Sequence, residues 1–222
     1  MRPFAIRPRA IRELDADKTG SATIFIVEDN LELRRALQML LRSEGYAVEA
    51  HTSAESFLDD FEPDRSGCLI ADLRLPGENG LALQDELKQR GSTLPFILIT
   101  GHASVDASVR AFKSGAFDFI RKPFDPPALL ESVRRAVESD RRARDEEGAR
   151  RDVEGRLSRM TSREREVLQL LLDGKSSKEI AGRLGISVRT VEGHRRRVLG
   201  KANASSVANL ILTVLKLGGT RS

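Results

Sequence analysis

The first half of the chain alternates short, continuous apolar runs with segments whose apolar residues recur every three or four positions. Such continuous runs are typical of strands buried in a parallel sheet, and the spaced pattern is typical of amphipathic helices. The predicted strands are residues 23–27, 46–50, 68–72, 95–99 and 117–121. Helices are predicted after Asn30, after Ser53, over residues 80–89, through Val105, Val109 and Phe112, and from Pro126. Five repeats of strand and helix predict a doubly wound, flavodoxin-like α/β domain with a five-stranded parallel sheet and helices on both faces.

The last third of the chain has helical periodicity only. Thr161 with Glu164 and Ser176 with Glu179 form capping boxes, and Ser187 caps a third helix. The core face predicted for that third helix is Val188, Val191, Val198 and Leu199, and the opposite face carries Arg189, Gly193, Arg196 and Arg197. A fourth helix over residues 205–217 is apolar over a wide face, so part of it is a candidate dimer surface. The pattern predicts a small all-α four-helix domain with a helix-turn-helix.

A long, charged helix is predicted between these two domains. The helical pattern runs from Pro126 to about Glu147 without Gly or Pro, and residues 140–147 are almost wholly charged. Gly148 and Gly155 then weaken the helix, which favours a hinge between them. Sustained apolar heptads are absent from this sequence, so a coiled coil is not expected. The expected organisation is a loose tail over residues 1–20, an α/β domain over 21–139, a charged helical linker or hinge over 140–156 and a helical domain over 157–222.

Charge distinguishes the two domains as well. Residues 21–125 carry 11 Lys and Arg against 17 Asp and Glu, a net charge of −6, whereas residues 156–222 carry 14 against 5, a net charge of +9. A basic domain is typical of a nucleic-acid partner, although a basic face can also serve solubility alone. The single cysteine, Cys68, excludes a disulfide framework or a cysteine metal site. The sequence has no apolar run of membrane-span length and its basic tail lacks the apolar core of a signal peptide, so we expect a cytoplasmic protein with no membrane partner.

Polar side chains stand at the carboxyl ends of four predicted strands. Glu28 and Asp29 follow the first strand, Asp72 ends the third, Thr100 follows the fourth and Lys122 follows the fifth. Ligands of such sheets bind at the carboxyl ends of the strands, so these side chains are expected to converge. Three carboxylates suit Mg²⁺, and Asp72 is placed as a nucleophile for a phosphoryl group whose oxygens Lys122 and Thr100 would contact. Each residue alone would more simply be a helix cap, a turn former or a solvated loop residue, but the combination favours a site.

The same motifs carry a family resemblance. Residues 23–137 resemble the receiver domain of two-component response regulators, through Glu28-Asp29, Asp72 with its Leu-Pro-Gly loop, Thr100-Gly101-His102 and residues 119–124. The resemblance implies that a partner histidine kinase phosphorylates Asp72. It implies that Mg²⁺ is held by Glu28, Asp29, Asp72 and the backbone carbonyl of Arg74. It also implies that Thr100 and Phe119 move together as a switch and that the Lys122-Pro123 bond is cis. Glu28 stands where many members have Asp.

The basic domain carries a second resemblance. Residues 161–217 resemble the LuxR-type DNA-binding domain, through residues 163–168, 178–181 and 186–195. Together the two domains resemble the NarL/FixJ class of response regulators, and Arg74 and His102 point to its FixJ-like branch. The residues expected to contact DNA are Lys178, Arg189, Thr190, Glu192, Gly193, His194, Arg196, Arg197 and Lys201. The partners implied are a sensor histidine kinase, double-stranded DNA, a second copy of the chain once phosphorylated and, as a further candidate, RNA polymerase.

Two other functions compete with a phosphorylation-controlled transcription regulator. The first is a phosphatase with an aspartyl-phosphate intermediate, an enzyme that typically has a second acid two residues after its nucleophile. That position is Arg74 here, and no further domain offers a substrate pocket, so we expect no enzymatic role. The second is a receiver that binds a partner without phosphate. The full set of Glu28, Asp29, Asp72, Thr100 and Lys122 argues against it.

Overall fold

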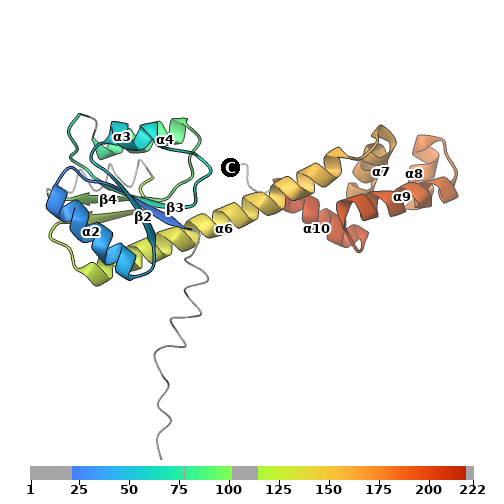
Figure 1. Cartoon of the computed structure of the whole chain (residues 1–222). Helices are drawn as coiled ribbons and strands as arrows, with labels where there is room; N and C mark the ends of the chain where they lie inside the picture. The colour runs from blue at the N-terminus through green and yellow to red at the C-terminus, as the bar shows by residue number, and fades with distance from the viewer. Residues whose placement is uncertain (1–21, 78, 102–114, 219–222) are drawn as a thin grey trace, which may run out of the picture. The chain divides into compact units, whose positions relative to one another are not determined.

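The computed structural model describes residues 22–77, 79–101 and 115–218, with side chains described as far as residue 215. The chain divides into two compact units, Met1–Ala143 and Arg144–Ser222 (Figure 1). The helix predicted through Val105, Val109 and Phe112, and the predicted residue His102, lie outside the described residues.

The first unit is built on a five-stranded parallel sheet. Its strands are β1 (Thr23–Val27), β2 (Ala47–His51), β3 (Gly67–Asp72), β4 (Phe96–Thr100) and β5 (Asp118–Arg121). They are ordered β2-β1-β3-β4-β5, and every neighbouring pair is parallel. The predicted flavodoxin-like fold is therefore confirmed. The strand order reverses at β1 and β3, where such sheets open a crevice for ligands.

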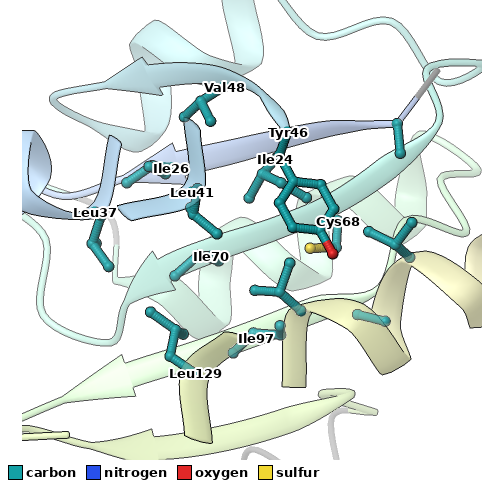
Figure 2. Close-up of a cluster of buried hydrophobic side chains, with 14 of the residues drawn as sticks. Ile24, Ile26, Leu37, Leu41, Tyr46, Val48, Cys68, Ile70, Ile97 and Leu129 are labelled. Atoms are coloured by element: carbon teal, nitrogen blue, oxygen red, sulfur yellow. The ribbon is translucent and has the colours of Figure 1, made fainter. Parts of the chain in front are cut away.

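Helices cover both faces of this sheet (Figure 1). The helices α2 (Leu31–Ser43) and α6 (Pro126–Ser158) pack on one face, and α3 (Ala54–Asp59) and α4 (Gly80–Gln89) pack on the other. Because strand side chains alternate between faces, Ile24 and Ile26 join the first core, shown in Figure 2, while Phe25 and Val27 join the second. Local sequence starts α2 and α3 where expected, since Asn30 and Ser53 accept hydrogen bonds from main-chain amides of the first turn.

The helix α6 extends further than the sequence predicted. It continues through Gly148 and Gly155 to Ser158 without a break. Each glycine costs a helix up to about 1 kcal/mol. Ion pairs one turn apart, Arg151–Glu147, Arg150–Glu154 and Arg156–Asp152, offset part of that cost, at about 0.3–0.5 kcal/mol each. Bending at this segment stays a prediction.

The second unit is a small helical domain. Its helices beyond α6 are α7 (Ser162–Leu172), α8 (Ser177–Leu184), α9 (Val188–Ala202) and α10 (Val207–Gly218). Both predicted capping boxes and the Ser187 cap are confirmed, and Gly185 ends α8 in the left-handed conformation. Their common core includes Val167, Ile180, Val191, Val198 and Leu210. The prediction that Val188 faces this core is wrong: the residue is 47% exposed, because it is the first residue of α9 and stands at the turn.

None of the described helices is by itself long and apolar enough to cross a membrane. The helices α9 and α10 reach that length and composition only as a pair, which is bent by 47° at the break between them.

Candidate functional site

Three carboxylates meet at the carboxyl ends of β1 and β3. Oxygens of Glu28, Asp29 and Asp72 lie within 4.8 Å of one another. Glu28 is fully buried and Asp72 nearly so, whereas Asp29 is exposed. The register of the sheet pairs Val27 of β1 with Ala71 of β3. The residues that follow them, Glu28 and Asp72, therefore lie side by side at the same end of two neighbouring strands. Charges this close repel one another strongly unless a cation lies between them.

Lys122 supplies such a cation from the end of β5. Its ammonium donates to Glu28 Oε2 at 2.7 Å and to Asp72 Oδ2 at 2.5 Å. Burial alone would lower the pKa of Lys122, but the hydrogen bonds to Asp72 and Glu28 outweigh burial and raise that pKa above its ordinary value. Burial raises the pKa of Glu28 in spite of the opposing hydrogen bond from Lys122. The Lys122-Pro123 bond is cis, as the resemblance implied.

The chain around Asp72 is closely packed. Asp72 Oδ1 accepts from the amide of Arg74 at 2.8 Å, while the side chain of Arg74 is exposed. The helix α4 begins directly against this loop: a Cβ on Gly80 would lie 2.6 Å from the carbonyl oxygen of Asp72, so only glycine fits there. The loop before α4 turns at Gly77, whose φ of +82° also favours glycine. These two glycines fix the loop that follows Asp72.

The two residues expected to act as a switch lie on neighbouring strands. Thr100 is fully buried at the end of β4. Its main-chain carbonyl accepts a hydrogen bond from the amide of Lys122 at 2.7 Å. Phe119 on β5 stands beside Leu98 of β4 and is half-buried against the second core. Thr100 follows Ile99, which pairs with Asp72 of β3, whereas Phe119 lies one strand further along the sheet, so their joint movement stays a prediction.

The acidic cluster fits Mg²⁺ by its chemistry. Glu28, Asp29 and Asp72 offer only carboxylate oxygens, which Mg²⁺ prefers. Oxygens bound to one Mg²⁺ at about 2.1 Å stand at most about 4.2 Å apart. One oxygen from each of the three carboxylates lies within 4.8 Å of the others, which is close to that span.

The helix α9 presents a basic face opposite its core face. Its arginines Arg189, Arg196 and Arg197 are exposed, as are Thr190 and Glu192, and Lys178 is exposed on α8. A Cβ on Gly193 would meet nothing within 4 Å, so there is open space beside this position on the helix. His194 is half-buried, and within the described part of the chain its Nδ1 has no hydrogen-bond partner.

A polar network that the sequence pattern did not indicate joins α8 to α9. The hydroxyl of Ser177 donates to Glu192, and Arg195 donates to the same hydroxyl at 3.4 Å. Ser177 and Arg195 are ordinary surface residue types, and their pairing depends on the angle between two helices. Glu192 is therefore held toward α8, a tertiary contact that spacing along the chain does not reveal.

Lys201 has a partner inside its own domain. Its ammonium donates to Glu164 Oε2 at 2.6 Å and to the carbonyl of Arg159 at 3.1 Å. Glu164 is the buried acid of the first capping box. This ion pair ties the end of α9 to the start of α7. A DNA contact by Lys201 stays a prediction, and such a contact would compete with this pair.

Comparisons with known proteins agree with both units. The family model described as the response regulator receiver domain matches residues 24–134, and the model for bacterial regulatory proteins of the luxR family matches residues 158–214. The transcriptional regulatory protein FixJ of Azorhizobium caulinodans is 41% identical over 89% of this chain and 94% of its own length. Nodulation protein W of Bradyrhizobium diazoefficiens is 39% identical over 91% and 89%. The solved structure of the response regulator StyR is 38% identical and has a TM-score of 0.82, covering 88% of this chain and 99% of that one.

Proposed function

This chain belongs to the FixJ-like response regulators, in which a receiver domain is joined to a LuxR-type DNA-binding domain, and we propose that Asp72 is its phosphoryl acceptor. This family consists of transcriptional regulators and is not enzymatic in general. A receiver domain implies a histidine kinase as partner, and a LuxR-type domain implies DNA.

The observation that carries the proposal is the setting of Asp72. Its carboxylate contacts Lys122 at 2.5 Å, lies beside the two other acids at the strand ends and keeps some exposure, at 8%. Glu28 is the less suitable acceptor, because it is fully buried. Mg²⁺ held by Glu28, Asp29, Asp72 and the carbonyl of Arg74 would supply positive charge to the phosphoryl oxygens.

The proposed step is an in-line phosphoryl transfer. An oxygen of Asp72 attacks the phosphorus of a phosphohistidine on the kinase, so an O–P bond forms while the P–N bond breaks and the electron pair stays on the imidazole. Lys122 neutralises charge on the transferred group, and the hydroxyl of Thr100 binds one of its oxygens. Movement of Thr100 toward that oxygen vacates space into which Phe119 turns, which carries the signal to the surface of β4 and β5.

For the output domain we propose that α9 lies in the major groove of DNA. The exposed arginines of this helix suit phosphates and can also contact guanine in bidentate fashion. The proposed contact residues are Lys178, Arg189, Thr190, Glu192, Gly193, His194, Arg196, Arg197 and Lys201.

Phosphorylation is proposed to favour a homodimer. The helix α10 supports this role, since Leu212 and Leu215 are 60% and 63% exposed on a helix whose opposite side packs in the core through Leu210. A pair of α9 helices would then contact two half-sites of one operator. RNA polymerase is the further partner proposed for the DNA-bound form.

Phosphorylation of the Asp72→Asn variant tests the proposal. The wild type should gain one phosphoryl group from acetyl phosphate and Mg²⁺, measured by intact-mass spectrometry, and the variant should gain none, because an amide is a much weaker nucleophile than a carboxylate. Asp145→Asn, which changes an exposed acid in the second unit, is the matched control and should behave as wild type. Uptake by Asp72→Asn at the wild-type rate would refute the assignment.

A further inference from the structure

Arg34 connects α2 to the strand end that carries the acidic pair. Its Nη1 donates to the main-chain carbonyl of Glu28 at 2.6 Å and to that of Asp29 at 3.2 Å. The side chain is half-buried, whereas that of the next residue, Arg35, is exposed. One guanidinium nitrogen thus holds the main chain of both acids that converge on Asp72.

The main chain at this point decides where the two carboxylates lie. Glu28 is buried and reaches Lys122, while Asp29 is exposed, yet their oxygens still lie within 4.8 Å of each other and of Asp72. The amide of Glu28 donates to His51 at 3.2 Å. The carbonyls of the next two peptide groups, Glu28–Asp29 and Asp29–Asn30, are held by Arg34. A rotation of either peptide would redirect a carboxylate away from the cluster.

We propose that Arg34 is a positioning residue for Mg²⁺ binding and hence for phosphorylation of Asp72. It contacts neither the reacting atoms nor the carboxylate oxygens, and it acts through the carbonyls of Glu28 and Asp29. The planar guanidinium suits this role because it directs its N–H donors in fixed directions, whereas the ammonium of a lysine is a flexible point charge. The proposal rests on the proposed function of the acidic cluster.

Arg34 affects Mg²⁺ affinity in two ways, which act in opposite directions. Its fixed positive charge lies near the cluster and, taken alone, repels Mg²⁺, so that removing the charge would tighten Mg²⁺ binding. Its hydrogen bonds orient the ligands, so that removing them would weaken binding. Outer contacts of this kind typically change metal affinity by about 10- to 100-fold. The sign of the change therefore distinguishes positioning from charge alone.

Calorimetric titration of the full chain with Mg²⁺ measures that sign. Arg34→Met, which keeps the aliphatic bulk and removes the donors, should weaken Mg²⁺ binding by about tenfold. Arg34→Lys should recover part of the loss, and Arg35→Met, which removes an exposed arginine at the next position, should match the wild type. In the acetyl phosphate reaction, Arg34→Met should need more Mg²⁺ for half-maximal rate and approach the wild-type rate at saturation.

Unchanged or tighter Mg²⁺ binding by Arg34→Met would overturn the proposal. So would a lower thermal unfolding midpoint with an unchanged Mg²⁺ dissociation constant, since that result would assign Arg34 to helix packing alone. If Arg34→Met does not fold, Arg34→Lys is compared with the wild type instead. Unchanged or tighter Mg²⁺ binding by Arg34→Lys would then overturn the proposal. Failure of the wild type itself to bind Mg²⁺ or to phosphorylate Asp72 would instead refute the proposed function of the cluster.

Discussion

Lys122 allows two buried carboxylates to lie side by side at the receiver site. It contacts both Glu28 and Asp72, and those hydrogen bonds keep the pKa of its ammonium high although burial opposes them. The ammonium therefore stays charged over the whole neutral range. A fixed positive charge beside Asp72 also suits the proposed phosphorylation of this residue, because it would stabilise the oxygens of an incoming phosphoryl group.

Arg74 is the residue that we expect to control how long the phosphoryl group persists. It follows Asp72 by two positions, and its long exposed side chain can lie across the phosphoryl oxygens where water must approach. A guanidinium has no acceptor with which to orient that water. Arg74→Asn should shorten the lifetime of the phosphorylated form several-fold, because asparagine is shorter and its amide oxygen can accept from the attacking water.

Loss of the phosphoryl group after removal of acetyl phosphate, followed by intact-mass spectrometry, measures this lifetime. The exposed Arg35 offers the matched control, and Arg35→Asn should leave the lifetime unchanged. A lifetime that is unchanged or longer in Arg74→Asn would contradict shielding by Arg74 and would leave the assignment of Asp72 untouched.

Individual residues differ in how far sequence could predict them. Glu28, Asp29, Asp72 and Lys122 were predictable because each directly follows or ends a recognisable strand, and parallel strands bring their ends together. Arg34 was not, because its role depends on which way a flexible side chain turns from α2 toward main-chain carbonyls. Every residue has a main-chain carbonyl, so the sequence does not indicate which carbonyls accept a hydrogen bond from Arg34.

At the scale of elements, the ion pair between Glu164 and Lys201 joins α7 to α9. The pKa of Glu164 is lowered from its ordinary value of 4.5 to about 2. The largest cause is the hydrogen bond from Lys201, and the next is the hydrogen bond from the main-chain amide of Thr161. The carboxylate therefore favours the folded state above about pH 4.5, and this contribution is lost as the pH falls toward 2. Glu164→Gln removes that pH-dependent contribution.

Thermal unfolding of the fragment Arg144–Ser222, followed by circular dichroism, measures the effect. Glu164→Gln should unfold at a lower temperature than wild type at pH 7, and the gap should narrow as the pH falls from 4.5 toward 2. Glu166→Gln is the control, because Glu166 pairs with Arg163 on an exposed surface. A gap for Glu164→Gln that stays constant down to pH 2 would contradict the pairing.

The helices and strands themselves were largely predictable. Capping residues such as Thr161, Ser176 and Ser187 act within one turn of the chain, and the structure confirms each of them. The continuous course of α6 through Gly148 and Gly155 was not predicted. Glycine propensity is a local signal, whereas the ion pairs that support this helix form only once side chains one turn apart adopt compatible rotamers.

At the scale of the whole molecule, the two domains differ in charge. Residues 21–125 of the receiver domain carry a net charge of −6, and residues 156–222 of the LuxR-type domain carry a net charge of +9. The hydrophobic patterns predicted both folds, because each unit buries its own core. The proposed coupling between the two units could not be predicted in this way, because it would depend on a free-energy difference between the phosphorylated and unphosphorylated chains.

A phosphoryl group on Asp72 is expected to strengthen DNA binding by α9. A duplex selected from random sequence by the fragment Arg144–Ser222 provides the probe, and fluorescence anisotropy gives the affinity of the full chain with and without acetyl phosphate and Mg²⁺. Wild type should bind about tenfold more tightly when phosphorylated, in line with typical allosteric coupling of about 1–3 kcal/mol, and Asp72→Asn should not respond. Equal affinity of both forms, with mass spectrometry confirming the phosphoryl group on Asp72, would contradict the account.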